Sequence, residues 1–158
     1  MPLRLVFFVT AFLCGISTST LHADALPRSV STSRQFIVYG ADPPLRGAVC
    51  ELAERTKGKL LSTVKTRDEW KIPIVVNAQY PQANAPDLPA ASLTFSQTGF
   101  GLKIQLDLLI PPDVNAAAVQ RELLRATLLE IMYRERTNLS PGSAYMQPPP
   151  WLLEGIVA

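Results

Sequence analysis

The sequence predicts an α+β domain with a mostly antiparallel sheet and helices beside it. Three observations support this prediction. The chain has 158 residues, which is room for one domain, and 47% of them are apolar, which is enough to fill a core. Runs with the period-two pattern of strands are interleaved with runs that carry the helical period. Two of the strand-like runs flank a short connection that contains glycine, which is typical of an antiparallel hairpin.

Residues 1–25 are interpreted as an export signal, with a buried helix or an uncleaved anchor as the alternatives. Arg4 gives a positive start, and the apolar run at 5–16 is shorter than the about 20 residues of a membrane span. The tripeptide Ala-Asp-Ala at 23–25 places small residues where signal peptidase requires them. After cleavage we expect a periplasmic or secreted protein without a stable membrane span. Residues 26–34 are polar and rich in serine, so we expect a flexible leader there.

Removal of the signal limits the chemistry of the mature chain. The only histidine, His22, and one of the two cysteines, Cys14, would leave with it. Cys50 then has no partner for an internal disulfide, and its apolar neighbours favour a small core residue over a reactive thiol. Without histidine, Cys–His and Ser–His enzymes are excluded. A Ser–Lys pair stays open, although no motif supports it.

The predicted domain spans 35–158 and begins with a β-rich run at 35–39 that a glycine ends. A helix is expected at 45–65, where apolar residues recur at helical spacing after two prolines that suit a first turn. A second, largely buried strand is expected at 72–78. Pro73 near its start indicates either an edge strand or the beginning of a strand.

Residues 92–97 and 102–110 are predicted to form the hairpin. Apolar and polar residues alternate in the second run, so one face should be buried and the other exposed to water. The strongest predicted helix follows at 115–136, with Asp113 or Asn115 as its cap. It is apolar over much of its circumference and should be largely buried.

The last segment, 151–158, starts a new apolar helix after three prolines. Because no polar cap or turn follows it, we expect the chain to be truncated at its C-terminal end relative to its relatives. The formal net charge is +2 without a concentrated basic run, so we do not expect nucleic-acid binding. No glycine-rich phosphate loop is present in the sequence.

Two segments carry the most specific pattern, namely RELLR at 121–125 and WLLEG at 151–155. Together they resemble the gluzincin metallopeptidases, whose zinc helix carries H-E-x-x-H and whose next helix opens with a W-x-x-E-G sequence. The order of a sheet before the zinc helix is also similar. In that family the two histidines and the later glutamate bind zinc, and the first glutamate is the general base.

The resemblance places Arg121 and Arg125 at the histidine positions, Glu122 at the base position and Glu154 at the position of the third ligand. Arginine stays protonated and has no lone pair for a metal, and two carboxylates alone make a poor zinc site. We therefore expect no bound metal or cofactor and no zinc peptidase activity. An arginine in the former metal space is expected to form a buried ion pair with Glu154.

A second register of the motif is possible at 129–133, where LEIMY also lacks both histidines. We prefer the first register because it puts polar groups at both ligand positions. The alternative to the resemblance is an unrelated α+β domain, in which Glu122–Arg125 and Glu130–Arg134 are ordinary helical ion pairs.

The sequence therefore predicts a non-catalytic domain, similar to a metallopeptidase scaffold, with a structural or protein-binding role in the cell envelope. The alternative is an exported hydrolase that uses metal-free carboxylates, with Glu122 and Glu154 in one cleft, or a metal site completed outside this sequence. An exposed apolar patch around Trp151 and Tyr145 would favour binding of an unknown protein partner, whereas a deep polar cleft would favour catalysis.

Overall fold

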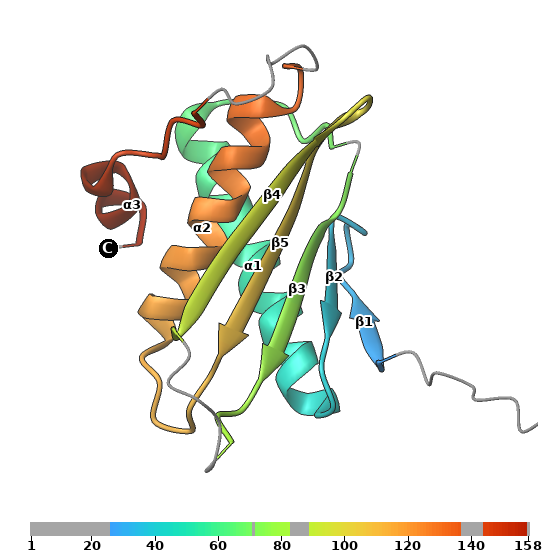
Figure 1. Cartoon of the computed structure of the whole chain (residues 1–158). Coiled ribbons are helices and arrows are strands. Elements are labelled where there is room, and N and C mark those ends of the chain that lie inside the picture. Colours follow the sequence, from blue (N-terminus) through green and yellow to red (C-terminus); the bar gives the residue numbers. More distant parts are fainter. Residues whose placement is uncertain (1–25, 71, 83–88, 137–143, 158) are drawn as a thin grey trace, which may run out of the picture.

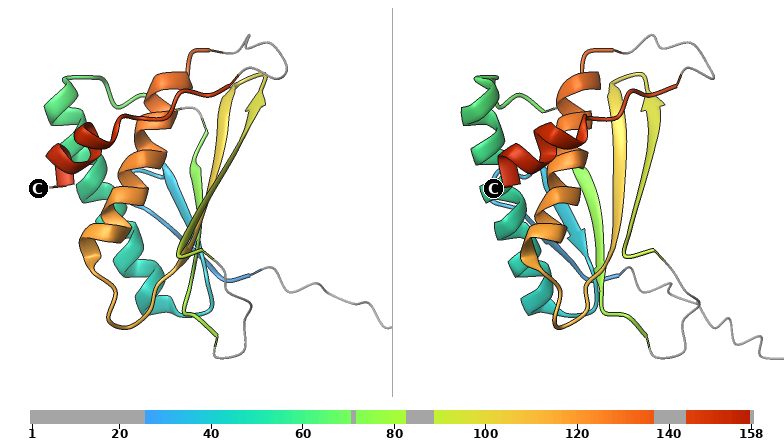
Figure 2. Two further views of the ribbon diagram at one scale, coloured as in Figure 1. Left: turned by 60° about the vertical axis from the view of Figure 1, so that its left-hand side comes forward. Right: turned by 90° about the vertical axis from the view of Figure 1, so that its left-hand side faces the viewer.

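The computed structural model describes residues 26–70, 72–82, 89–136 and 144–157. The predicted export signal lies outside the described residues. Within them, five strands form one mixed sheet and three helices lie on one side of it (Figures 1 and 2), which confirms the α+β class. None of the described helices is long and apolar enough to cross a membrane.

The sheet has the order β1-β2-β3-β5-β4. Its strands are β1 (Arg28–Val30), β2 (Phe36–Tyr39), β3 (Ile74–Gln79), β4 (Ala91–Thr98) and β5 (Gly101–Leu109). The two outer pairs are antiparallel and hold the larger share of the paired residues, whereas the two inner pairs are parallel. The pair β2–β3 is parallel because helix α1 (Pro43–Val64) returns the chain to the other end of the sheet between them.

The region expected to be a flexible leader contains β1, so this prediction was wrong for those residues. A tight turn pairs β1 with β2: the hydroxyl of Ser31 accepts the N–H of Phe36, and Arg34 adopts a left-handed φ of 63°. The N–H of Gly40 also donates to the carbonyl of Pro27. A polar sequence forms a strand here because these hydrogen bonds satisfy its backbone at the sheet edge.

The other predicted strands are confirmed. Pro73 precedes β3, which is a central strand, so it marks the beginning of a strand and not an edge. The hairpin of β4 and β5 is present, and the alternating apolar residues of β5 face the helices in the core. Gly101 has a φ of +134°, and a Cβ there would lie 3.2 Å from the carbonyl oxygen of Arg134, so the hairpin tip closely approaches the end of the second helix.

The helices occupy the predicted segments. Helix α1 begins at the two prolines, and α2 (Ala116–Tyr133) is capped by Asn115, whose side chain accepts the N–H of Ala117 at 2.9 Å. Both pack on one face of the sheet and form the main core with it. The short α3 (Pro150–Val157) lies across α1 and α2 and forms a second, smaller apolar cluster with them.

Candidate functional site

The predicted site residues on α2 lie at the surface near the first residues of β4. Arg121 is exposed, and Glu122 is partly buried. Both line a cavity of about 260 Å³, together with Ala90, Ala91, Leu108, Leu109, Val114, Ala118 and Val119. Arg125 contacts Glu122 at 3.4 Å, an i,i+3 ion pair, and its Nε is buried without a hydrogen-bond partner among the described residues.

Glu154 does not join these residues. It is exposed on α3, and the described residues contain no ion pair between it and either arginine. The predicted buried ion pair with Glu154 is therefore wrong. The reason is the rotation of α3: Leu153 and Ile156 bury themselves against α1 and α2, and the side chain one position from Leu153 then points to solvent.

The second register of the motif lies in a more interior position than the first. Leu129 is fully buried in the core, Glu130 is only 3% exposed, and Tyr133 is 4% exposed. The hydroxyl of Tyr133 accepts the N–H of Met146 at 2.7 Å, and its ring packs edge-on against Tyr145. These positions therefore attach the segment before α3 to α2.

Glu130 forms a two-point ion pair with Arg134. The guanidinium Nε and Nη2 donate to one carboxylate oxygen at 3.1 and 2.7 Å. Its Nη1 donates to the backbone carbonyls of Arg67 and Glu69, so one arginine joins α2 to the segment between α1 and β3. Burial raises the pKa of Glu130 to about 7 although Arg134 acts to lower it, and Asp68 adds a smaller upward effect.

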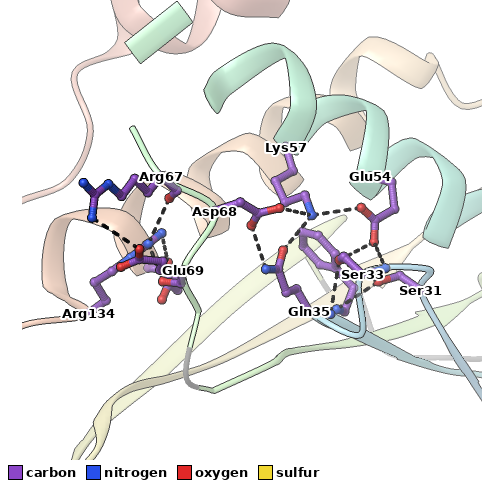
Figure 3. Close-up of polar contacts among 11 residues, drawn as sticks. Ser31, Ser33, Gln35, Glu54, Lys57, Arg67, Asp68, Glu69 and Arg134 are labelled. Carbon is purple, nitrogen blue, oxygen red and sulfur yellow. Dashed lines mark hydrogen bonds and ion pairs between the residues drawn. The ribbon is translucent and has the colours of Figure 1, made fainter. Parts of the chain in front are cut away.

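Lys57 on α1 carries a second buried charge, and the residue is only 5% exposed. Its ammonium donates to Gln35 at 2.6 Å, to Glu54 at 3.0 Å and to Asp68 at 3.2 Å, so all three of its donors have acceptors (Figure 3). This ammonium and the guanidinium of Arg134 each lie 5.9 Å from the ring centre of Trp70.

We call this group of side chains the Trp70 cluster: Glu54, Lys57, Asp68, Trp70, Glu130 and Arg134. Burial acts to raise the pKa of Glu54, but hydrogen bonds from the serines of the β1–β2 turn and from Lys57 outweigh it and lower the pKa to about 2. Every charged member has a partner inside the cluster, so its chemistry is that of a structural tie between α1, α2 and the segment before β3.

Cys50 is buried in the main core, as expected. Burial raises the pKa of its thiol, with Glu54 as a second cause, so the reactive thiolate is disfavoured. Within the part of the chain that the structure describes, no three His, Cys, Asp or Glu side chains are grouped as a metal site would require.

The outer edge of β4 begins beside the cavity that Arg121 and Glu122 line. Among the described strands, β4 pairs with β5 alone. The N–H of Leu109 donates to the backbone carbonyl of Ala90. In an antiparallel ladder, residues that hydrogen-bond to the neighbouring strand alternate with residues that do not. Counted from Ala90, every second residue therefore directs its backbone N–H and C=O toward β5. The remaining residues present their backbone N–H and C=O outward, and we call them the β4 edge: Ala91, Leu93, Phe95 and Gln97.

The β4 edge and the Trp70 cluster were not predicted from the sequence. A signal for Glu130 was present, because it is the only charged residue in the apolar run ATLLEIMY at 126–133. A charge at that place in a helix that is buried on most sides requires a partner. The sequence has no comparable signal for Lys57 or for the free edge of β4, because both depend on which elements become neighbours.

Comparisons of this chain with family models, curated proteins and solved structures found no match.

Proposed function

We propose that this chain is an exported, non-catalytic domain that binds an extended segment of a partner protein along the β4 edge. The observation that carries the proposal is the eight-residue strand β4, whose outer edge is unpaired among the described strands, beside a cavity that contains Arg121 and Glu122. An unpaired edge is a template on which an extended peptide adds a further strand through main-chain hydrogen bonds.

The residues at the motif positions support a non-catalytic role. In the first register, arginines stand where the similar peptidases have their histidine ligands. In the second, Leu129 packs in the core, and the Tyr133 hydroxyl accepts a backbone N–H. In both registers these side chains lack the imidazole nitrogens that would bind zinc. The scaffold similar to a gluzincin would then serve recognition alone.

The alternative hydrolase has less support. It needs Glu122 and Glu154 in one cleft, but the described lining of the cavity at Glu122 does not include Glu154. Glu130 has a pKa suited to proton transfer at neutral pH, yet it is 3% exposed and two of the three guanidinium nitrogens of Arg134 donate to it. A general base must reach the proton that it accepts, and Glu130 is directed at Arg134 instead.

The cavity places charged side chains next to the backbone to which the peptide would bind. It brings the exposed cation of Arg121 and the carboxylate of Glu122 beside Ala91, the first residue of the β4 edge. A peptide that adds to β4 would place alternate side chains on the helix side, where this cavity lies. Charge complementarity to the pair would then favour one peptide register over another.

The first experiment selects ligands from a random peptide library displayed on phage, with the purified mature chain as the target. We expect selected peptides to protect the outward amides of Leu93, Phe95 and Gln97 from hydrogen exchange. Ala91→Pro removes one outward N–H at an edge position where proline is tolerated, and we expect it to weaken binding about tenfold. Ser92→Ala is the matched control, because the backbone of Ser92 faces β5.

Three results would contradict the proposal. One is protection that appears on other strands while the β4 edge stays unprotected. Another is metal-dependent cleavage of unfolded protein substrates that is lost in Glu122→Gln or Glu130→Gln, since this would establish catalysis. Equal binding by Ala91→Pro and Ser92→Ala would leave no role for the backbone of the β4 edge.

A further inference from the structure

A second cavity, far along the sheet from the hairpin tip, lies at the carboxyl ends of β2 and β3 and has a volume of about 400 Å³. Its apolar lining includes Tyr39, Leu45 and Ala78. Leu26 also lines it, and the carbonyl of the next residue, Pro27, accepts the N–H of Gly40 at 3.1 Å. This bond holds the chain at the mouth of the cavity.

Asp42 is the only charged side chain among the described residues of this lining. It occupies the N-cap position of α1 but makes no side-chain capping bond, and the proline at the second helical position has no N–H to donate. Its Oδ2 accepts the hydroxyl of Tyr80 at 2.9 Å instead. The carboxylate is therefore available to another donor inside the cavity.

Neither Arg46 on α1 nor Arg28 on β1 fills this position. The guanidinium of Arg46 donates to the carbonyls of Gly40 and Ala41 and to the hydroxyl of Ser29, and it does not line the cavity. Arg28 on β1 is exposed and also lies outside the lining. The Asp42 carboxylate thus has a neutral partner, Tyr80, and no ion pair among the described residues.

We infer that this cavity binds the new amino terminus that export creates. Cleavage after residue 25 would make Leu26 the first residue and give it an α-ammonium group, which is a cation at neutral pH. The ammonium would lie in the same cavity as Asp42 and form an ion pair with its carboxylate. Before cleavage, the same nitrogen is a neutral amide, so the ion pair forms only in the processed chain.

This inference goes beyond peptide binding at the β4 edge and rests on the predicted cleavage site. Its consequence is local: β1 is an edge strand of three residues, and an ion pair at its start would fix it to the first turn of α1. Processing would then be coupled to the order of the first strand.

The test is a titration of the α-amino group in the mature chain, whose start at Leu26 is verified by N-terminal sequencing. The amino group is labelled by reductive methylation with ¹³C and its pKa is measured by NMR. We expect a pKa about half a unit above the ordinary value of about 8, as for an exposed ion pair. Asp42→Asn should return it to the ordinary value.

Glu51→Gln is the matched control, because Glu51 is an exposed carboxylate farther along α1 and its removal changes the net charge equally. A chain that retains Ala25 moves the ammonium by about 3.5 Å and should also show an ordinary pKa. The inference is overturned if Asp42→Asn and Glu51→Gln shift the pKa equally, or if the chain that retains Ala25 keeps the raised value. A different natural first residue would overturn the processing step, and peptide binding at β4 would be unaffected.

Discussion

The Trp70 cluster and the β4 edge are two polar regions of one small domain, and they are built in opposite ways. In the cluster, charges from α1, α2 and the segment before β3 are paired with one another, and Lys57 and Glu130 among them are buried. At the β4 edge, backbone groups face outward and have no partner strand among the described elements. The cluster uses its polar groups to hold the fold, and the edge keeps its polar groups available.

The difference shows where a function is to be sought in this chain. A buried charge without a partner is costly, so the members of the cluster are constrained by stability and cannot easily serve a ligand. Outward backbone groups are satisfied by water in the free protein and can exchange water for a partner strand at little cost.

The largest expected effect is on stability, from the loss of Lys57. Lys57→Met leaves the carboxylates of Glu54 and Asp68 without their shared ammonium, and we expect the free energy of unfolding to fall by about 3 kcal/mol. Arg55→Met is the matched control on the same helix, because Arg55 forms an exposed pair with Glu51 and should lose less than about 1 kcal/mol. Urea unfolding of the two variants measures the difference.

If the free energy of unfolding falls equally in both variants, the ion pairs of the Trp70 cluster contribute no more to stability than an exposed ion pair does. The contrast between the Trp70 cluster and the β4 edge would then be wrong. Peptide binding at the β4 edge should be unchanged in both variants under conditions where they are folded.

The next largest expected effect is on the pH dependence of stability, to which two carboxylates of the Trp70 cluster contribute with opposite signs. The pKa of Glu130 is about 7 in the folded protein, above its ordinary value near 4.5, so its contribution to stability is present below pH 4.5 and is lost as the pH rises to 7. The pKa of Glu54 is about 2, so its contribution is present above pH 4.5 and is lost as the pH falls to 2.

Glu130→Gln should therefore gain stability relative to the natural chain between pH 4.5 and 7.5, by about 2 kcal/mol. Glu54→Gln should show no such gain and should flatten the acid side of the profile. Urea unfolding at a series of pH values measures both. A constant difference between Glu130→Gln and the natural chain across this range would show that burial does not raise the pKa of Glu130.

The smallest effect is expected at Glu154. Because it is exposed on α3 and pairs with neither arginine, Glu154→Gln should change the free energy of unfolding by less than about 0.5 kcal/mol. Leu153→Ala, one position away, removes a side chain buried against α2 and should cost about 2–3 kcal/mol. A loss of several kcal/mol in Glu154→Gln would restore the buried ion pair that the sequence predicted.

Local patterns predicted most of the elements correctly. The helical spacing of α1 and α2, the alternation in β5 and the glycine-containing turn act over a few residues, so the sequence reveals them directly. The strand β1 was missed because its residues are polar and its pairing depends on a turn closed by Ser31 and Arg34. The motif at 121–125 was visible, but its relation to Glu154 depended on the rotation of α3.

The sequence by itself determined the α+β class, the alternating face of β5, the buried character of α2 and the absence of histidine at positions 121, 125, 129 and 133. The tertiary structure alone decided which charges meet, which strand lies at the edge and which residues line a common cavity. Lys57, Trp70 and Arg134 come from α1, the segment before β3 and the end of α2, and their contacts follow from how these three parts pack together. Local periodicity fixes which face of an element is apolar, but the neighbours of that face are fixed only when the whole core is packed.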